Sequence, residues 1–293
     1  MSETTASLRR KIDSAGDLHS VVRTMKSLAA SSIGQYEKSV LALADYQRTI
    51  ELGLSVCFRK NVPPAALATR GKGKEVVVSA IVFGSDQGMV GQFNDQIADF
   101  AVKTLVAMPG KAIAWAIGER VHARLDDAGM PLIALFPVPN SVKAITPLIA
   151  RLLDESETRR DRGEIDELYL FYNRPTSGTA FAPVSQRLLP LDEIWFSERA
   201  TVPWPTAKLP EIIGDATVTL RALIREYLFV SLFRACAESL ASENSSRLSA
   251  MQRAEKNIDE MLEELNRSFH RLRQSGIDSE LFDVLSGYES LEK

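Results

Sequence analysis

The sequence has few residues suited to catalysis or metal binding: two cysteines and three histidines among 293 residues. Cys57 and Cys236 form no CxxC motif and have no histidine at ligand spacing, which argues against a disulfide scaffold or a zinc site. His19, His122 and His270 lie in different segments, and no GxSxG or HExxH motif is present. We therefore expect no catalytic site, no metal and no cofactor in this chain.

Charge and hydrophobicity argue against a nucleic-acid-binding protein and against a membrane-spanning one. The formal net charge is −3, from 35 basic and 38 acidic residues, so the basic excess typical of nucleic-acid-binding proteins is missing. No uncharged run approaches the roughly 20 residues that cross a bilayer, and the first residues lack the apolar core of a signal peptide. We expect a cytoplasmic chain without direct membrane insertion.

Proline is confined to the middle of the chain. All 13 prolines lie between Pro63 and Pro210, which leaves both ends free to form long helices because proline breaks a helix interior. Apolar residues in the first arm follow an alternating spacing of four and three, typical of a coiled-coil seam. The fourteen positions at this spacing are Leu8, Ile12, Ala15, His19, Val22, Lys26, Ala29, Ile33, Tyr36, Val40, Leu43, Gln47, Ile50 and Leu54. Eleven of them are apolar; the exceptions are His19, Lys26 and Gln47.

The C-terminal arm repeats the pattern. Neither glycine nor proline occurs from Asp215 to Ser275, which predicts a helix of about 60 residues and about 90 Å. Its seam is predicted at Met251, Ala254, Ile258, Met261, Leu265, Ser268 and Leu272. If both arms join the middle region they run antiparallel, and paired residue numbers sum to roughly 275. Met25 then faces the neighbourhood of Arg247 to Met251.

The last twenty residues have no N-terminal partner on this register. Their apolar side chains should be covered by something else, because free termini are normally polar. The alternative is that this end folds back onto the same chain. The apolar residues are Ile277, Leu281, Phe282, Val284, Leu285 and Tyr288.

The middle region predicts a different architecture. Apolar, β-rich runs at 76–85, 111–118, 132–139 and 167–174 are separated by helix-like segments, a pattern typical of a parallel sheet covered on both faces. The fold class is therefore a long antiparallel two-helix coiled coil formed by both termini, with an inserted α/β, Rossmann-like domain. We place the shaft at 1–62 and 211–293 and the inserted foot domain at 75–200.

The turn GSDQGMVGQFND at 84–95 is the most site-like segment. It follows an apolar strand and leads into a helix, where free backbone N–H groups can hold a phosphate. However, its glycines do not form GxGxxG, and no Walker lysine follows. A tight strand-to-helix turn is favoured over nucleotide binding. The residues that define the turn are Asp86, Gly88, Gly91 and Asn94.

Three motifs together resemble the gamma subunit of F-type ATP synthases. RTMKSLAAS at 23–31 is similar to the family's KAMxMVAAS, and GSDQGMVGQFN at 84–94 is similar to SDRGLCGGFN. The block SENSSRLSAMQRAEKNIDEMLEELNRSFHRLRQSGIDSELFDVLSG at 242–287 resembles SExxxRMxAMxxATxNAxxxIxxLxxxxNxxRQxxITxELxEIxxG. Their order and position span nearly the whole chain.

The resemblance implies a rotor shaft without catalysis of its own. Its partners would be the alpha and beta subunits around the C-terminal end, with the epsilon subunit and the membrane rotor ring at the foot domain. The complex would lie at the cytoplasmic face of a bacterial inner membrane. The implied coupling contacts are Met25, Lys26, Arg247, Met251, Gln274, Ile277, Asp278, Leu281, Phe282 and Leu285.

Some family positions differ here. Ser20-Val21-Val22 replaces the family's Lys-Ile-Thr, Ile277-Asp278 replaces Ile-Thr, and the middle motif has Gln87 for Arg. These departures favour a divergent bacterial branch. Two other readings stay open: a phosphate- or nucleotide-binding α/β enzyme with helical dimerisation arms, and a free coiled-coil scaffold.

Overall fold

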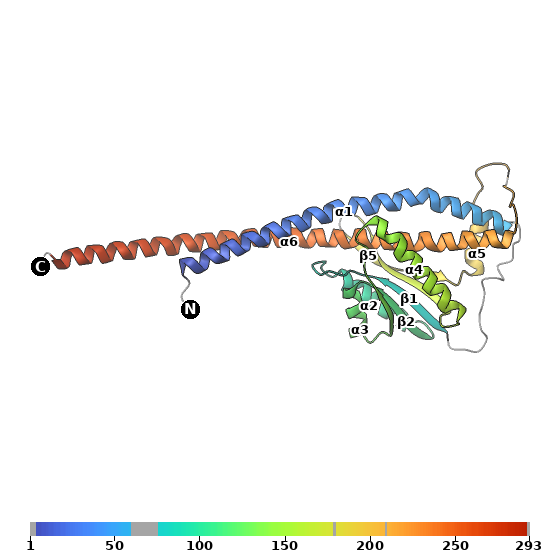
Figure 1. Cartoon of the computed structure of the whole chain (residues 1–293), viewed down its shortest axis with the longest axis horizontal. Helices are drawn as coiled ribbons and strands as arrows, with labels where there is room; N and C mark the ends of the chain where they lie inside the picture. Colours follow the sequence, from blue (N-terminus) through green and yellow to red (C-terminus); the bar gives the residue numbers. More distant parts are fainter. Residues whose placement is uncertain (1–3, 60–75, 178–179, 209, 292–293) are drawn as a thin grey trace. The chain divides into compact units, whose positions relative to one another are not determined.

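The computed structural model describes residues 4–59, 76–177, 180–208 and 210–291, without the side chains of 193–194 and 286–291. Its contacts divide the chain into unit 1, Met1–Ala29 with Leu248–Lys293, and unit 2, Ala30–Arg247. In chain order the elements are α1 (Thr5–Arg59), β1 (Val77–Phe83), α2 (Phe93–Val106), β2 (Lys111–Ile117), α3 (Glu119–Asp127), β3 (Leu132–Phe136), α4 (Val142–Asp161), β4 (Glu167–Pro175), β5 (Phe181–Leu189), α5 (Glu193–Ala200) and α6 (Ala216–Leu291) (Figure 1).

Unit 2 contains a five-stranded sheet in the order β3-β2-β1-β4-β5. The first four strands are parallel, as predicted, and this order is that of doubly wound dinucleotide-binding folds. The antiparallel edge strand β5 was not predicted from the sequence. Its Pro183 and the polar run Ser185 to Arg187 hide the strand pattern, and an edge strand tolerates proline because one side needs no N–H donor.

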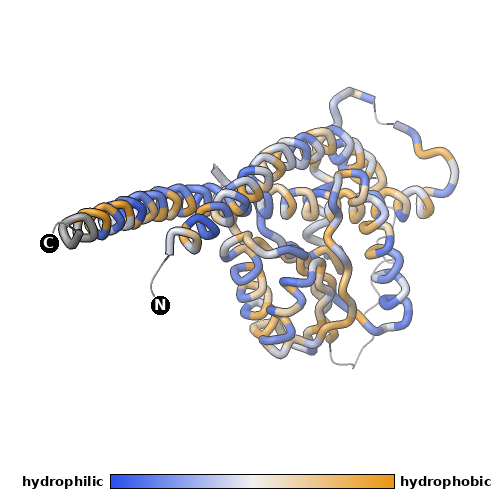
Figure 2. Tube along the Cα trace, turned by 60° about the vertical axis from the view of Figure 1, so that its left-hand side comes forward, coloured by the Kyte–Doolittle hydropathy of each residue, from blue (hydrophilic) through white to orange (hydrophobic). Residues whose placement is uncertain are grey.

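The two faces of the sheet have separate cores. Along β1, Val78, Ala80 and Val82 pack with the buried side chains of α2 and α3. Ile81 and Phe83 point the other way, into a cluster with α4 and the unit 2 parts of α1 and α6. This is the period of two expected for a strand covered on both faces. Figure 2 shows hydrophobic stretches in orange running through the compact part of the chain that contains the sheet.

Helices α1 and α6 are antiparallel in unit 2. The Tyr46 hydroxyl donates a hydrogen bond to Glu226 at 2.7 Å, so paired numbers sum to 272 (46 + 226). A Cβ placed on Gly53 would lie 3.1 Å from Leu223, which gives a sum of 276 (53 + 223). These values confirm the predicted register near 275.

Unit 1 contains the start of α1 and the C-terminal part of α6. Val22, Met251 and Ile258 are buried between the helices, and Ala254 packs against them. Across the pair, a His19 ring nitrogen lies 3.2 Å from the Asp259 carboxylate, a sum of 278 (19 + 259). The fourteen predicted seam positions of α1, through both units, are all buried or half-buried. The seam prediction is therefore confirmed for α1.

One predicted seam position of α6 is wrong. Met261 is 49% exposed, and Leu262 packs against the unit 1 cluster instead. A straight helix of about 3.6 residues per turn drifts relative to a strict seven-residue repeat, and a four-residue step from Ile258 keeps Leu262 facing α1. Helix α6 is also longer than predicted, with 76 residues, because it continues through Gly276.

The domain limits 1–62, 75–200 and 211–293 remain predictions. Residues 60–75 lie outside the described residues, and so does residue 209. Among the described residues, no helix is both long and apolar enough to cross a membrane.

Candidate functional site

The turn after β1 is closed by the protein's own groups. Asn94, buried on α2, accepts a hydrogen bond from the Ser85 amide at 2.9 Å and donates one to the Ser85 hydroxyl at 2.8 Å. The Gly84 amide donates to the Ile117 carbonyl at 2.8 Å. A Cβ on Gly84 would lie 2.3 Å from Val121, so only glycine lets the strand approach α3 this closely.

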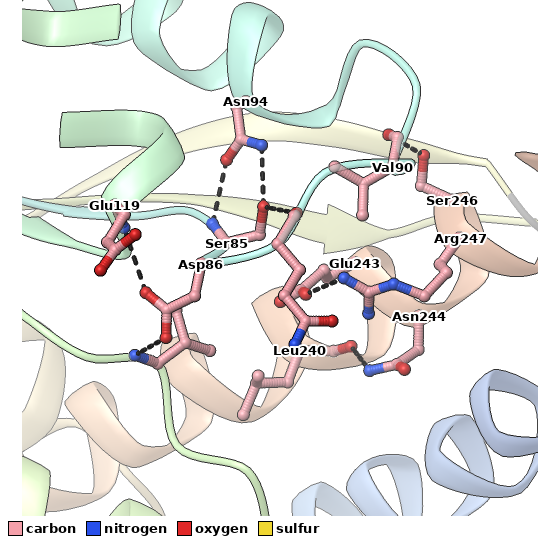
Figure 3. Close-up of polar contacts among 12 residues, drawn as sticks. Ser85, Asp86, Val90, Asn94, Glu119, Leu240, Glu243, Asn244, Ser246 and Arg247 are labelled. Carbon is pink, nitrogen blue, oxygen red and sulfur yellow. Dashed lines mark hydrogen bonds and ion pairs between the residues drawn. The ribbon is translucent and has the colours of Figure 1, made fainter. Parts of the chain in front are cut away.

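Asp86 ties the turn to two other segments. One carboxylate oxygen accepts from the Glu119 amide at 3.1 Å, and the other accepts from the Val138 amide at 2.9 Å (Figure 3). Charge-assisted bonds of this kind are stronger than neutral ones. Asp86 therefore fixes the turn against the start of α3 and against the loop after β3.

The two predicted turn glycines have different settings. Gly91 has a φ of +56°, a backbone conformation that glycine adopts without strain, and Met89 nearby has a φ of +59°. Gly88 is half-buried and has ordinary space around it. Val90 lies between them, and its carbonyl accepts a hydrogen bond from the Ser246 hydroxyl of α6 at 2.5 Å.

A polar cavity of about 210 Å³ lies beside this turn in unit 2. Its lining includes Tyr36, Asp86, Asn140, Asn244 and the ion pair of Glu243 with Arg247. An Arg247 guanidinium nitrogen donates to the Glu243 carboxylate at 2.7 Å (Figure 3). The two side chains are only 7% and 12% exposed.

Burial raises the pKa of the Glu243 carboxyl above its ordinary value of 4.5. The positive charge of Arg247 and its hydrogen bond act in the opposite direction, and the nearby Asp86 adds a smaller rise. Desolvation disfavours the charged form of a carboxyl, which is why burial dominates here. Glu243 is thus the carboxyl of the cavity that takes up a proton more readily than an exposed glutamate.

Sequence reasoning identified Arg247 but missed Glu243. A glutamate four residues before an arginine is usually a surface pair on a helix. The available signal was its position shortly after the strongly apolar run IREYLFVSLFRACAESL at 224–240 of the same predicted helix. Asn94 and Asp86, both predicted turn residues, both stabilise the turn: Asn94 bonds Ser85, and Asp86 bonds the amides of Glu119 and Val138.

Three predicted contact residues lie on the helix pair of unit 1. Met25 is half-buried against the cluster that contains Met251, and Met251 itself is 2% exposed. Lys26 forms an ion pair with Glu255 across the pair. The structure thus brings these residues together at one level, with Met251 in the interior between α1 and α6.

The end of α6 is exposed on all sides. Gln274 and Asp278 are exposed polar residues. The apolar residues are also exposed: Ile277 by 55%, Leu281 by 58%, Phe282 by 67% and Leu285 by 52%. The alternative in which this end folds back onto the chain is therefore wrong for the described residues; the side chain of Tyr288 lies outside them. We call residues 277–285 the apolar tip.

Among the described residues, no group of three or more histidine, cysteine or acidic side chains is arranged to hold a metal ion. The fully buried thiol of Cys236 has its pKa raised, first by burial and then by Glu243, which keeps it in the unreactive thiol form.

Comparison with known proteins gives one consistent result. Residues 4–291 match the family model described as ATP synthase. The chain is 28% identical over 301 residues to the ATP synthase gamma chain of Rhizobium etli, and that alignment covers 97% of this chain and 98% of the relative. It is 29% identical to the ATP synthase gamma chain of Rhizobium rhizogenes, with the same coverage.

Solved structures share the fold. A rotor chain of the Euglena gracilis mitochondrial ATP synthase superposes with a TM-score of 0.65 at 14% identity, covering 93% of this chain and 98% of that one. A chain of the central stalk and c-ring of the Tetrahymena thermophila mitochondrial ATP synthase gives a TM-score of 0.58 at 18% identity, with 80% and 99% coverage. At these identities the likeness concerns the fold.

Proposed function

The chain belongs to the ATP synthase family, and from this membership as a gamma subunit we propose how it works in the complex. It is the central rotor shaft, whose rotation couples ion flow through the membrane ring to conformational change at the catalytic sites. A shaft shifts those sites only if it contacts them differently at each angle. Two unlike helices supply the required asymmetry.

We propose that the chain itself is not catalytic. The amides of Gly84 and Ser85, where a phosphate would bind, already donate within the protein. The adjoining cavity of about 210 Å³ is smaller than the roughly 300–1,000 Å³ of typical ligand sites. These features support ATP chemistry on partner subunits and speak against the nucleotide-binding alternative.

The proposed partners follow from the named relatives. One similar structure is a rotor and another is a central stalk with its c-ring. We propose that alpha and beta subunits surround the apolar tip, and that the inserted domain meets the epsilon subunit and the c-ring. Because the named relatives include bacterial gamma chains, we place the complex at the cytoplasmic face of a bacterial inner membrane.

The apolar tip carries this proposal. Exposed apolar side chains gathered on one segment are typical of a surface that another protein covers. The proposed contacts at this end are Gln274, Ile277, Asp278, Leu281, Phe282 and Leu285. An apolar sleeve holds such a segment without strong polar anchors, which suits rotation.

The test replaces one tip residue by a charged one in complex reconstituted with alpha and beta subunits and the membrane sector. Leu281→Asp should lower ion pumping per ATP hydrolysed by at least several-fold, because a carboxylate in an apolar sleeve is costly to desolvate. Leu41→Asp is the matched control, since Leu41 is 73% exposed on α1. Equal pumping by the two variants would contradict the proposed contact.

A second set of contacts is proposed at Met25 and Lys26, with Met251 supporting Met25 from the interior of the pair. Met25→Lys adds an ammonium beside Lys26 at a half-buried position and should impair energy coupling. ATP-driven pumping by the reconstituted complex measures this. Unchanged coupling would count against the placement of Met25 at a partner contact.

A further inference from the structure

Arg247 is withheld from solvent in the free chain. Its side chain is 12% exposed, and a guanidinium nitrogen donates to Glu243 one helical turn earlier on α6. The same spacing on the same helix gives an exposed pair elsewhere: Glu263 and Arg267 are bonded at 2.9 Å with side chains 70% and 79% exposed. The burial of the first pair is therefore a property of its cavity and not of the helix.

The buried pair is joined by a single hydrogen bond. The second carboxylate oxygen of Glu243, Oε2, is buried without a hydrogen-bond partner among the described residues, and so is the Nε of Arg247. A guanidinium and a carboxylate can form two parallel bonds, and this pair forms one. The free oxygen has room to accept a proton inside the cavity.

The charged and titratable groups that face Glu243 come from three parts of the chain. Arg247 lies on α6 itself, Asp86 comes from the turn after β1, and the Tyr36 hydroxyl comes from α1. On α6 the buried Cys236 thiol interacts electrostatically with Glu243. The loop at 138–140 brings no charge. Asp86 is held by two backbone amides, whereas Glu243 and Arg247 are held to each other by one hydrogen bond.

We propose that Glu243 is a positioning residue for Arg247: its carboxylate holds the guanidinium inside the cavity, and a proton on Glu243 releases it toward an acidic group of a partner subunit. The inference rests on the proposed rotor function and on the coupling contact that the family resemblance implies for Arg247. The proton comes from solvent and adds to Oε2 of Glu243, so the charge of the pair changes from zero to +1. An unpaired guanidinium then recognises a carboxylate.

The first experiment uses the isolated full-length chain. Magnetic resonance of the Glu243 carboxyl carbon and the Arg247 Nε is followed between pH 8 and pH 4. Both signals should move with one shared midpoint above the ordinary glutamate value of 4.5. A constant Arg247 signal, or two different midpoints, would overturn the inference. This readout needs no variant.

The second experiment adds substitutions. Glu243→Gln should abolish the pH dependence of the Arg247 signal, because an amide does not titrate in this range. Glu263→Gln removes the exposed partner of Arg267 and should leave the Arg247 transition unchanged. A transition that persists in Glu243→Gln would overturn the role of Glu243.

The third experiment separates this inference from the proposed function. In reconstituted complex, Glu243→Gln should flatten the pH profile of pumping per ATP across the Glu243 transition, and Arg247→Gln should lower coupling on the acid side of that transition, where the guanidinium is released. An unchanged profile in Glu243→Gln, with coupling lost in Arg247→Gln, overturns the inference and leaves the rotor function standing. Full coupling in Arg247→Gln overturns the Arg247 contact and this inference with it, whereas the rotor function is tested separately by Leu281→Asp in the apolar tip.

Discussion

Between Ala235 and Ser245, helix α6 buries polar side chains, whereas between Ile277 and Leu285 the same helix exposes apolar ones. Several of the buried polar groups have partners: the Ser242 hydroxyl donates to the Asn173 carbonyl at 2.9 Å, and two arginines bind the Glu238 carboxylate. Buried polar groups are tolerated when hydrogen-bonded. The first stretch packs inside unit 2, and the second is the exposed surface at which we propose that a partner binds.

The largest expected difference between the two stretches is in stability. Leu232 of α6 is fully buried in the unit 2 core, so Leu232→Ala should cost about 2–5 kcal/mol. Leu281→Ala in the apolar tip should change stability by less than about 0.5 kcal/mol. All three tryptophans lie in unit 2, so urea unfolding followed by their fluorescence reports the first variant directly. Circular dichroism at 222 nm follows the tip variant. Similar losses of stability in Leu232→Ala and Leu281→Ala would contradict the difference between the buried and the exposed stretch of α6.

A pair of glycine substitutions should give effects of opposite sign. Gly84→Ala forces a methyl group to within 2.3 Å of Val121, and overpacking of this kind costs about 1–3 kcal/mol. Gly16→Ala meets nothing within 4 Å on α1 and should stabilise the helix by about 0.5–1 kcal/mol. Thermal unfolding followed by circular dichroism measures both. A stabilised Gly84→Ala would show that the turn is looser than described.

The hydrogen bond between Ser246 and Val90 should contribute less to the free energy of unfolding than the packing around Gly84. Ser246→Ala removes the donor to the Val90 carbonyl, and a typical hydrogen bond contributes about 0.5–1.5 kcal/mol. Urea unfolding measures the loss. Ser275→Ala, at an exposed position of α6, is the control and should not destabilise the chain. Equal effects would mean that the turn and α6 meet without help from this bond.

The smallest effect concerns the ion pair of unit 1. Hydrogen bonding to Lys26 lowers the pKa of the Glu255 carboxyl from 4.5, so its stabilisation is present above that value and is lost as the pH falls through the lowered pKa. Lys26→Gln should return the Glu255 midpoint toward 4.5, as read by carboxyl magnetic resonance. Lys256→Gln is the matched control, because Lys256 pairs with Glu260 along α6. A midpoint unmoved in Lys26→Gln would contradict the cross-helix pair.

The helix pair could be predicted because its information is local. A seam spacing and the absence of proline determine which side of a helix is apolar, and the register follows from the antiparallel arrangement. The prediction was wrong at Met261, where the repeat and the true helical period diverge. The edge strand β5 was missed because one side of it needs no partner, so its residues carry a weaker pattern.

The interior of the candidate site could be predicted only in part. Asp86 and Asn94 follow a strand within one turn, so their proximity is visible in the sequence. The burial of Glu243 depends on α6 meeting that turn from a distant part of the chain. A charged pair four residues apart gives the same pattern on a surface helix and in this cavity. Its pKa therefore follows from tertiary packing alone.

The apolar tip also bears on how the subunit is made. A newly synthesised copy presents the exposed side chains from Ile277 to Leu285 to every other new copy until a partner covers them. Surplus copies would therefore associate with one another or be degraded. If partner subunits cover the tip as proposed, synthesis of this chain has to keep pace with that of its partners.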